Sequence, residues 1–255
     1  MSPDRLKRIL LSLADGPLRV EWLRAELEHM SAADAAVLVN AVVEESEALD
    51  PRAREALLTI ALVFTDSNNV SFADRMRRET VVEDRLFGLR RLLRRAPPTS
   101  VRPQKPDEER VPQYEKGREL TLGERKSLAR RPDRKAFDKL ILDPHPLVIR
   151  QLLENPKMIE DDAIRLAARR PASVSAVQEL ARSYRFMSRP RVRMAIVQNP
   201  GSPPEIAIPL LGLCNREELR DIMKSTETSL ALRATAQELL ARKPPTPSET
   251  PPTLH

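Results

Sequence analysis

The side chains of this 255-residue sequence that could bind a metal are few and scattered. The histidines His29, His145 and His255 are far apart, and no two of them stand four residues apart on one helical face. A zinc or iron-sulfur site needs several ligands in one place, and the single cysteine, Cys214, cannot supply a cysteine-rich site or a disulfide within the chain. We therefore expect no metal and no cofactor.

Acidic pairs are the remaining candidates for general acid and base catalysis. Glu44-Glu45, Asp161-Asp162 and Glu217-Glu218 each fall near an expected helix end or on a solvated face. Asp161-Asp162 stands at an expected helix start, where negative charge is favourable. The sequence has no glycine-rich phosphate loop and no nucleophile elbow, and Cys214 is expected to be a small buried hydrophobic residue. We predict that the protein is not an enzyme.

Arginines offer a different chemistry, the binding of anions. If equivalent residues of a helical stack share one face, four arginines form a basic ladder, with the first and last at matching positions: Arg150, Arg165, Arg191 and Arg193. Such a ladder binds an acidic protein or nucleic-acid phosphates. Aromatic residues make up only 3% of the chain, so we do not expect stacking on single-stranded bases.

Other arginines favour a structural interpretation. We expect four of them in the last turns of helices, where cations complement the helix dipole: Arg130, Arg131, Arg169 and Arg170. A further group is interpreted as the solvated end of an amphipathic helix: Arg90, Arg91, Arg94 and Arg95.

The elements that must position these side chains are expected to be helices. Leu, Ala, Arg and Glu fill the sequence, glycine is rare, and no segment alternates apolar and polar residues as a strand does. The composition predicts an all-α protein. Ser31 and Asp50-Pro51 look like helix starts, and Gly16-Pro17 is interpreted as the end of the first helix. We expect one helix from about Phe72 to Arg95, with an apolar stripe along it.

A phrase ending in Asn-Pro or Arg-Pro recurs in the second half of the chain. The prolines Pro132, Pro156, Pro171 and Pro200 follow one another at spacings of 24, 15 and 29 residues. Proline cannot continue a helix, so each marks where one helix stops and another can begin. The irregular spacing indicates insertions or alternating half-units. Two further helices are expected over about 216–223 and 230–241.

Two copies of this phrase, Val148 to Pro156 and Val192 to Pro200, resemble the leucine-rich repeat variant, a bacterial repeat family related in shape to HEAT repeats. The phrases span 132–213, within a region of about 120–242 to which we assign the resemblance. The resemblance implies short alternating helices in a right-handed α-solenoid. A general HEAT-like stack of helical hairpins is the alternative. The iron-sulfur cluster associated with the family's founding member needs cysteines that this chain lacks.

Composition divides the chain into four segments. Residues 1–95 form an expected N-terminal helical domain with 15 basic and 16 acidic side chains. The proline- and charge-rich stretch 96–119 is expected to be a flexible linker, and the proline-rich tail 243–255 to be disordered. Residues 120–242 form the expected α-solenoid, and the region from 120 to the end has 23 basic against 16 acidic side chains.

These features favour two functions. The first is a non-enzymatic protein interaction scaffold or adaptor that uses a basic solenoid surface. The alternative is a nucleic-acid-binding protein whose arginine face contacts duplex phosphates. The start of the chain lacks a standard signal sequence, and no run of about 18 apolar residues occurs. We expect a cytoplasmic protein that does not span a membrane; the oligomeric state stays open.

Overall fold

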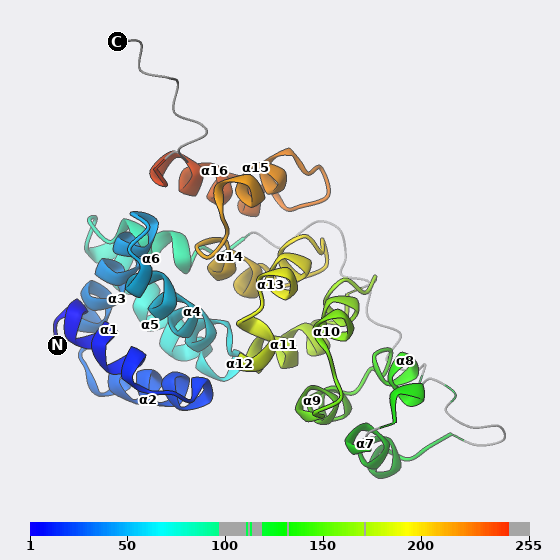
Figure 1. Ribbon diagram of the computed structural model, residues 1–255. Helices are drawn as coiled ribbons and strands as arrows, with labels where there is room; N and C mark the ends of the chain where they lie inside the picture. Colours follow the sequence, from blue (N-terminus) through cyan, green and yellow to red (C-terminus); the bar gives the residue numbers. More distant parts are fainter. Residues whose placement is uncertain (97–110, 112, 114–118, 132, 171, 245–255) are drawn as a thin grey trace, which may run out of the picture.

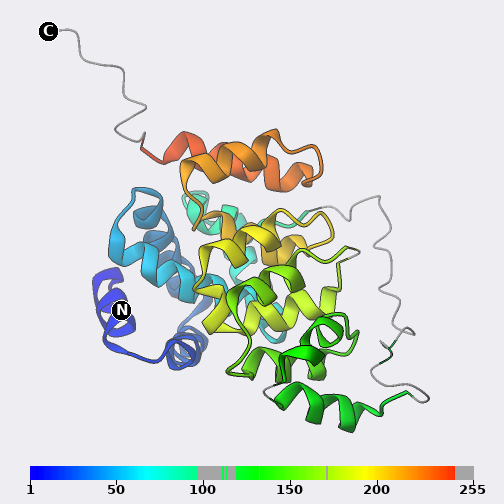
Figure 2. The ribbon, with the colours of Figure 1, turned by 45° about the vertical axis from the view of Figure 1, so that its right-hand side comes forward.

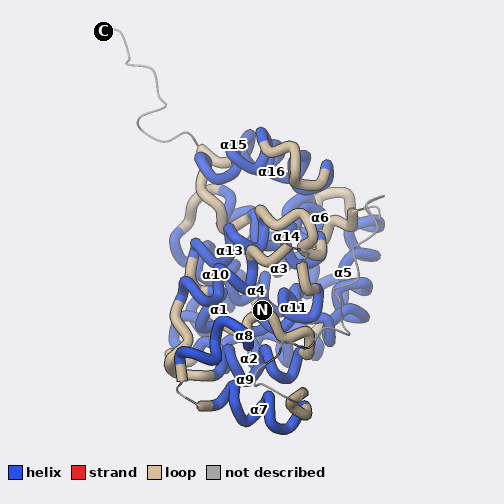
Figure 3. The backbone as a smooth tube through the Cα atoms, turned by 90° about the vertical axis from the view of Figure 1, so that its right-hand side faces the viewer, coloured by secondary structure: helices blue, strands red, loops and turns tan. Residues whose placement is uncertain are grey.

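In a computed structural model of the protein, every regular element among the described residues is a helix, which confirms the all-α prediction (Figure 3). The structure describes residues 1–96, 111, 113, 119–131, 133–170 and 172–244. The predicted linker over 96–119 and the predicted tail over 243–255 lie almost wholly outside these residues.

The N-terminal group of helices is drawn in blue to cyan-green in Figure 1. Its elements are α1 (Pro3–Ser12), α2 (Gly16–His29), α3 (Ala32–Glu47), α4 (Pro51–Thr65), the 3₁₀ turn η1 (Ser67–Asn69), α5 (Val70–Val82) and α6 (Phe87–Leu92).

Two of the predicted helix starts in this group are confirmed, and one predicted end is wrong. The Ser31 hydroxyl accepts from the backbone N–H of Asp34, and the Asp50 carboxylate accepts from that of Ala53, as N-cap side chains do. Gly16-Pro17, by contrast, opens α2 instead of ending α1, which already stops at Ser12. Proline has no N–H, and in the first turn of a helix that N–H would have no partner within the helix. The same dipeptide therefore suits a helix start.

The single helix expected over 72–95 is also wrong, because the chain breaks between α5 and α6. Glu83, after the last residue of α5, has an extended backbone. Both helices pack on α3, and Met76 and Leu89 are both fully buried. A straight helix could not bring both stretches onto α3, so the chain turns back to bury the second one.

The helices of the second half run from green to red in Figure 1. They are α7 (Leu122–Arg130), the 3₁₀ turn η2 (Arg134–Ala136), α8 (Phe137–Leu140), α9 (Pro146–Glu154), α10 (Glu160–Ala167), α11 (Val174–Arg182), α12 (Tyr184–Met187), α13 (Pro190–Val197), α14 (Pro204–Leu211), α15 (Arg216–Lys224) and α16 (Leu230–Arg242).

These helices pack in two rows, which explains the irregular proline spacing. In one row α7 packs on α9, α9 on α11 and α11 on α4; in the other α10 packs on α13, α13 on α14 and α14 on α16. Figures 1 and 2 show this succession, from α7 at one end to the pair α15–α16 at the other. The first two proline marks follow helices of one row and the last two follow helices of the other, so the 15-residue spacing is the step between rows.

Helix α4 lies at the border between the two groups. Its Leu58, Ala61 and Leu62 belong to the core of the second half, while Leu57 and Ile60 belong to the core of the first. The helices on either side of the segment 96–119 therefore pack directly on each other rather than lying apart as tethered units.

The two helices expected near the end of the chain are confirmed as α15 and α16. The predicted tail, however, begins one residue too early. Lys243 is buried, and its ammonium donates to the carbonyl oxygens of Gly212, at 2.9 Å, and Cys214. The folded part of the chain therefore includes Lys243, because its ammonium covers carbonyl groups that follow α14.

No single helix in the described part of the chain is long and apolar enough to cross a membrane. Helices α4 and α5 together, bent by 113°, meet the same test of length and composition.

Candidate interaction surface

The asparagine of the recurring phrase joins neighbouring helices of one row. Asn155, which is 2% exposed, donates from its side-chain amide to the carbonyl oxygens of Ala129 and Arg131, at 2.7 and 2.8 Å. Its side-chain oxygen accepts from the backbone N–H of Lys157, at 2.9 Å. One side chain thus satisfies carbonyls at the end of α7, which have no partner inside the helix, and holds the turn after α9.

Asn199 repeats this arrangement in the other row. Its amide donates to the carbonyl oxygens of Ala167, at 2.7 Å, and Arg169, at 2.9 Å, and its oxygen accepts from the N–H of Gly201, at 3.1 Å. Asn155 and Asn199 thus have the same role, linking α9 to α7 and α13 to α10. The parallel between the two phrases is a parallel in three-dimensional structure as well as in sequence.

Three of the four predicted ladder arginines are paired with carboxylates of other helices. Arg150 makes two hydrogen bonds to Glu179 of α11, at 2.8 and 3.0 Å. Arg165 lies 2.7 Å from Asp138, and Arg191 lies 3.1 Å from Asp161. These side chains connect successive helices of the stack, and their charges are compensated.

The fourth, Arg193, does not match Arg150, and that part of the prediction is wrong. Counted from Pro146 and Pro190, which open α9 and α13, Arg193 corresponds to the buried Ile149. Accordingly its side chain is half-buried, donates to the Met187 carbonyl at 2.7 Å, and has a pKa lowered by burial. Arg193 faces the interior, so it does not extend the row of Arg150.

The arginines interpreted as last-turn residues lie close to, but not always inside, the expected helices. Arg130 is in the last turn of α7 and Arg131 caps it, whereas Arg169 and Arg170 lie beyond Ala167, where α10 ends.

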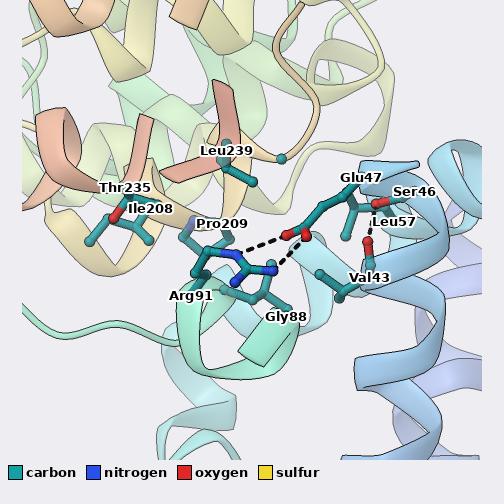
Figure 4. Close-up of a pocket in the computed structure, with 12 residues that line it drawn as sticks. Val43, Ser46, Glu47, Leu57, Gly88, Arg91, Ile208, Pro209, Thr235 and Leu239 are labelled. Carbon is teal, nitrogen blue, oxygen red and sulfur yellow. Dashed lines mark hydrogen bonds and ion pairs between the residues drawn. The ribbon is translucent and has the colours of Figure 1, made fainter. Parts of the chain in front are cut away.

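The arginines at the end of α6 are not simply solvated. Arg91 is buried and binds the carboxylate of Glu47, at 3.0 Å from its Nε, while Arg94 donates to Thr235 and Glu238 of α16. Figure 4 shows Arg91 and Glu47 facing each other beside a cavity of about 10 Å³, which is near the least volume that holds one water. Apolar side chains such as those of Leu57 and Leu239 line most of the remaining cavity wall. This site joins helices and has no room for a substrate.

Several of the residues considered for metal binding and catalysis have structural roles. His145 caps α9, with its ring nitrogen accepting from the N–H of Leu147. Asp162 and Glu218 accept from backbone N–H groups at the starts of α10 and α15. Cys214 is buried as predicted, and burial raises its pKa to about 12. Among the described residues no group of three or more His, Cys, Asp or Glu could hold a metal ion.

A basic surface that the sequence did not single out surrounds the turn between α9 and α10. The guanidinium of Arg185 donates to the carbonyl oxygens of Asn155 and Met158, at 3.0 and 2.7 Å, and that of Arg134 donates to Lys157, at 3.1 Å. Each guanidinium also lies over the ring of a nearby phenylalanine. The turn is therefore held by two arginines, one that precedes it in the sequence and one that follows it.

Four exposed cations gather near this turn, and within the described ranges no carboxylate lies at ion-pair distance from any of them. We call them the basic turn cluster: Arg131, Lys157, Arg185 and Arg189. The signal that could have found them is their position within or beside the proline phrases, as in Arg131-Pro132, Asn155-Pro156-Lys157 and Arg189-Pro190.

Comparison with known proteins identifies no relative: no family model, no curated protein and no solved structure matches this chain.

Proposed function

We propose that this protein is a non-enzymatic interaction scaffold whose second half is a short right-handed α-solenoid of the leucine-rich repeat variant or HEAT-like type. The observation that carries the proposal is the repeated use of Asn155 and Asn199 to bond one helix end to the next. Repeat proteins are built in this way, from units that contact mainly their neighbours and present an extended surface to a partner.

The polar side chains of the described core also support a scaffold. The carboxylates of Glu47 and Glu179, and the amide of Asn155, are engaged in bonds between helices. A catalytic site instead needs a general acid or base that faces a cavity large enough for a substrate. Interaction through the surface is the function that this arrangement supports best.

Nucleic-acid binding is the second candidate, and the excess of 23 basic over 16 acidic side chains from residue 120 onward favours it. The ion pairs of Arg150, Arg165 and Arg191 weigh against it, because a paired arginine has less free charge to offer a phosphate. A protein partner is therefore the better proposal.

The scaffold proposal can be tested by affinity purification with the full-length protein as bait, before and after nuclease treatment. We expect one or a few proteins to be enriched over a tag-only control, and their recovery to survive nuclease. Enrichment of nothing, or loss of all captured proteins with nuclease, would contradict the proposal.

A salt titration with generic duplex DNA separates the two candidates. A nucleic-acid-binding protein that neutralises several phosphates loses a factor of about 1,000 or more in affinity between about 50 and 200 mM salt. The scaffold proposal expects only weak binding at low salt. Tight, steeply salt-dependent binding of duplex DNA would favour the second candidate.

A further inference from the structure

In the turn formed by residues 155–158, the backbone carbonyl oxygens already accept hydrogen bonds from arginines. Arg185 occupies the carbonyl oxygens of Asn155 and Met158, and Arg134 occupies that of Lys157. The Asn155 side chain fixes the start of the turn to the end of α7. An approaching anion therefore meets cations, because the oxygens that would repel it are already bonded.

The members of the basic turn cluster are placed around this turn by separate contacts. The carbonyl of Arg131 is bonded to Asn155, Lys157 is part of the turn, and the Arg185 guanidinium rests on it. Arg189 follows the end of α12 and is the extended N-cap residue of α13. It stands between Arg185, which bonds to the turn, and Arg191, which pairs with Asp161 just after the turn. Four side chains from three separate stretches of sequence thus concentrate positive charge at one place.

The charges of the cluster are not compensated by carboxylates of the described residues, unlike those of neighbouring arginines. Arg134 beside it is paired with Asp162, with one bond of 3.1 Å, and Arg191 is paired with Asp161. In the described part of the chain the cluster residues bond to carbonyl oxygens or face solvent. A carbonyl oxygen satisfies an N–H but does not cancel a full positive charge, so the cluster attracts anions.

We propose that the basic turn cluster is the docking site for a short acidic segment of a partner protein, an inference that rests on the proposed function. Complementary charge between exposed surfaces guides association and selects the partner. A few carboxylates close together in sequence match the four cations in number.

The surroundings favour a compact acidic segment over nucleic acid. The exposed carboxylates of Asp133 and Glu154 border the cluster in sequence, and a duplex with one charge per about 1.7 Å would continue past them. Phe137 and Phe186, the nearby aromatic rings, are buried, so they offer no platform on which single-stranded bases could stack.

The test compares two triple variants of the full-length protein that change the formal charge equally. The cluster variant is Arg131→Glu, Lys157→Glu, Arg189→Glu; Arg185 is left in place because it holds the turn. The control variant is Arg5→Glu, Arg8→Glu, Arg52→Glu, which changes exposed residues of α1 and α4. Circular dichroism and thermal unfolding check that both variants keep the fold.

Fluorescence anisotropy then measures the binding of a short labelled polyglutamate peptide, with a polyglutamine peptide of equal length as the neutral control. We expect wild type to bind polyglutamate and not polyglutamine. The cluster variant should bind about tenfold more weakly or worse, and the control variant within about threefold of wild type.

Equal losses in the two variants would overturn the inference, because net charge alone would then explain the binding. So would no binding of polyglutamate by wild type, or cluster-dependent binding of duplex DNA in its place. The scaffold proposal is tested separately by affinity purification. If wild type and the cluster variant capture the same protein equally, the scaffold proposal is supported and the docking-site inference is contradicted.

Discussion

Arg242, the last residue of α16, donates from its Nε to the carboxylate of Glu47, the last residue of α3, at 2.8 Å. The same carboxylate accepts two bonds from Arg91 of α6. Glu47 is only 3% exposed, so two guanidinium groups surround one buried negative charge. The contact joins the N-terminal helices to a helix almost 200 residues later in the chain.

Replacing Glu47 with Gln should destabilise the protein strongly. The change leaves the buried Arg91 without a counter-charge, and breaking one side of a buried ion pair costs about 3 kcal/mol or more. Chemical denaturation measures the free energy of unfolding. The matched control is Glu238→Gln, which loosens the more exposed pair with Arg94 and should cost less than about 1 kcal/mol. Equal effects of the two variants would mean that Glu47 does not hold the helices together.

Asn155→Ala should show that the recurring asparagine links neighbouring helices. The substitution leaves the carbonyls of Ala129 and Arg131 without their side-chain partner, at a cost of about 2 to 3 kcal/mol. Asn155→Asp should be at least as harmful, since a carboxylate cannot donate to a carbonyl. As a control, Asn68→Ala, at an exposed asparagine, should stay within about 0.5 kcal/mol of wild type. If Asn155→Ala leaves thermal unfolding unchanged, the asparagine does not stabilise the packing of neighbouring helices.

Gly16→Ala should disturb the contact between α2 and α12. A Cβ at Gly16 would lie 2.1 Å from the ring of Tyr184, and such overpacking costs about 1 to 3 kcal/mol. Tyr184→Ala should relieve the clash, so Gly16→Ala should cost much less in that background than in wild type. Gly123→Ala is the control, because its Cβ would meet only the Thr121 hydroxyl at 4.0 Å. Additive effects of Gly16→Ala and Tyr184→Ala would show that the two residues are not in contact.

Lys243 should make stability increase with pH in the alkaline range. Burial lowers its pKa from 10.5 to about 8, so the folded protein loses this proton at a lower pH than the unfolded chain does. Between these values the unfolded state binds more protons, and stability rises with pH. Below pH 8 the folded protein has to bury the charged ammonium, and this cost is present in full. Between pH 8 and pH 10.5 the cost disappears, which raises the free energy of unfolding by at most about 3 kcal/mol.

The control for this effect is Lys243→Met, which cannot titrate at this position. The difference in unfolding free energy between wild type and Lys243→Met should shift in favour of wild type as pH rises from about 8 to about 10. A constant difference over this range would show that Lys243 is not buried in its charged form.

Local features of the fold were predictable because the interactions that decide them lie within a few residues. Ser31 and Asp50 bond to N–H groups only three residues ahead, so the sequence near a helix start contains the information. The position of Cys214 next to Leu213 similarly predicted its burial. Gly16-Pro17 was misread because proline suits the first turn of a helix as well as the region after one.

The ion pairing of the predicted ladder arginines could not be predicted from nearby residues. Arg150, Arg165 and Arg191 are cationic in any reading of the sequence, but their carboxylate partners are about 30 residues away along the chain. Whether a charge is free or compensated depends on which helices become neighbours. The basic turn cluster was missed for the same reason, since its members come from separate proline phrases that only the stack brings together.

By itself, the sequence determined that the chain is all-helical, where some of its helices begin, as at Ser31 and Asp50, and that asparagine and proline recur together at helix ends. These properties follow from backbone propensities and capping, which act over a single turn. Only the tertiary structure decided that α4 joins two cores, that Asn155 bonds to the helix before it, and which arginines keep an uncompensated charge. The reason is physical: burial and ion pairing depend on distances in space between residues far apart in sequence.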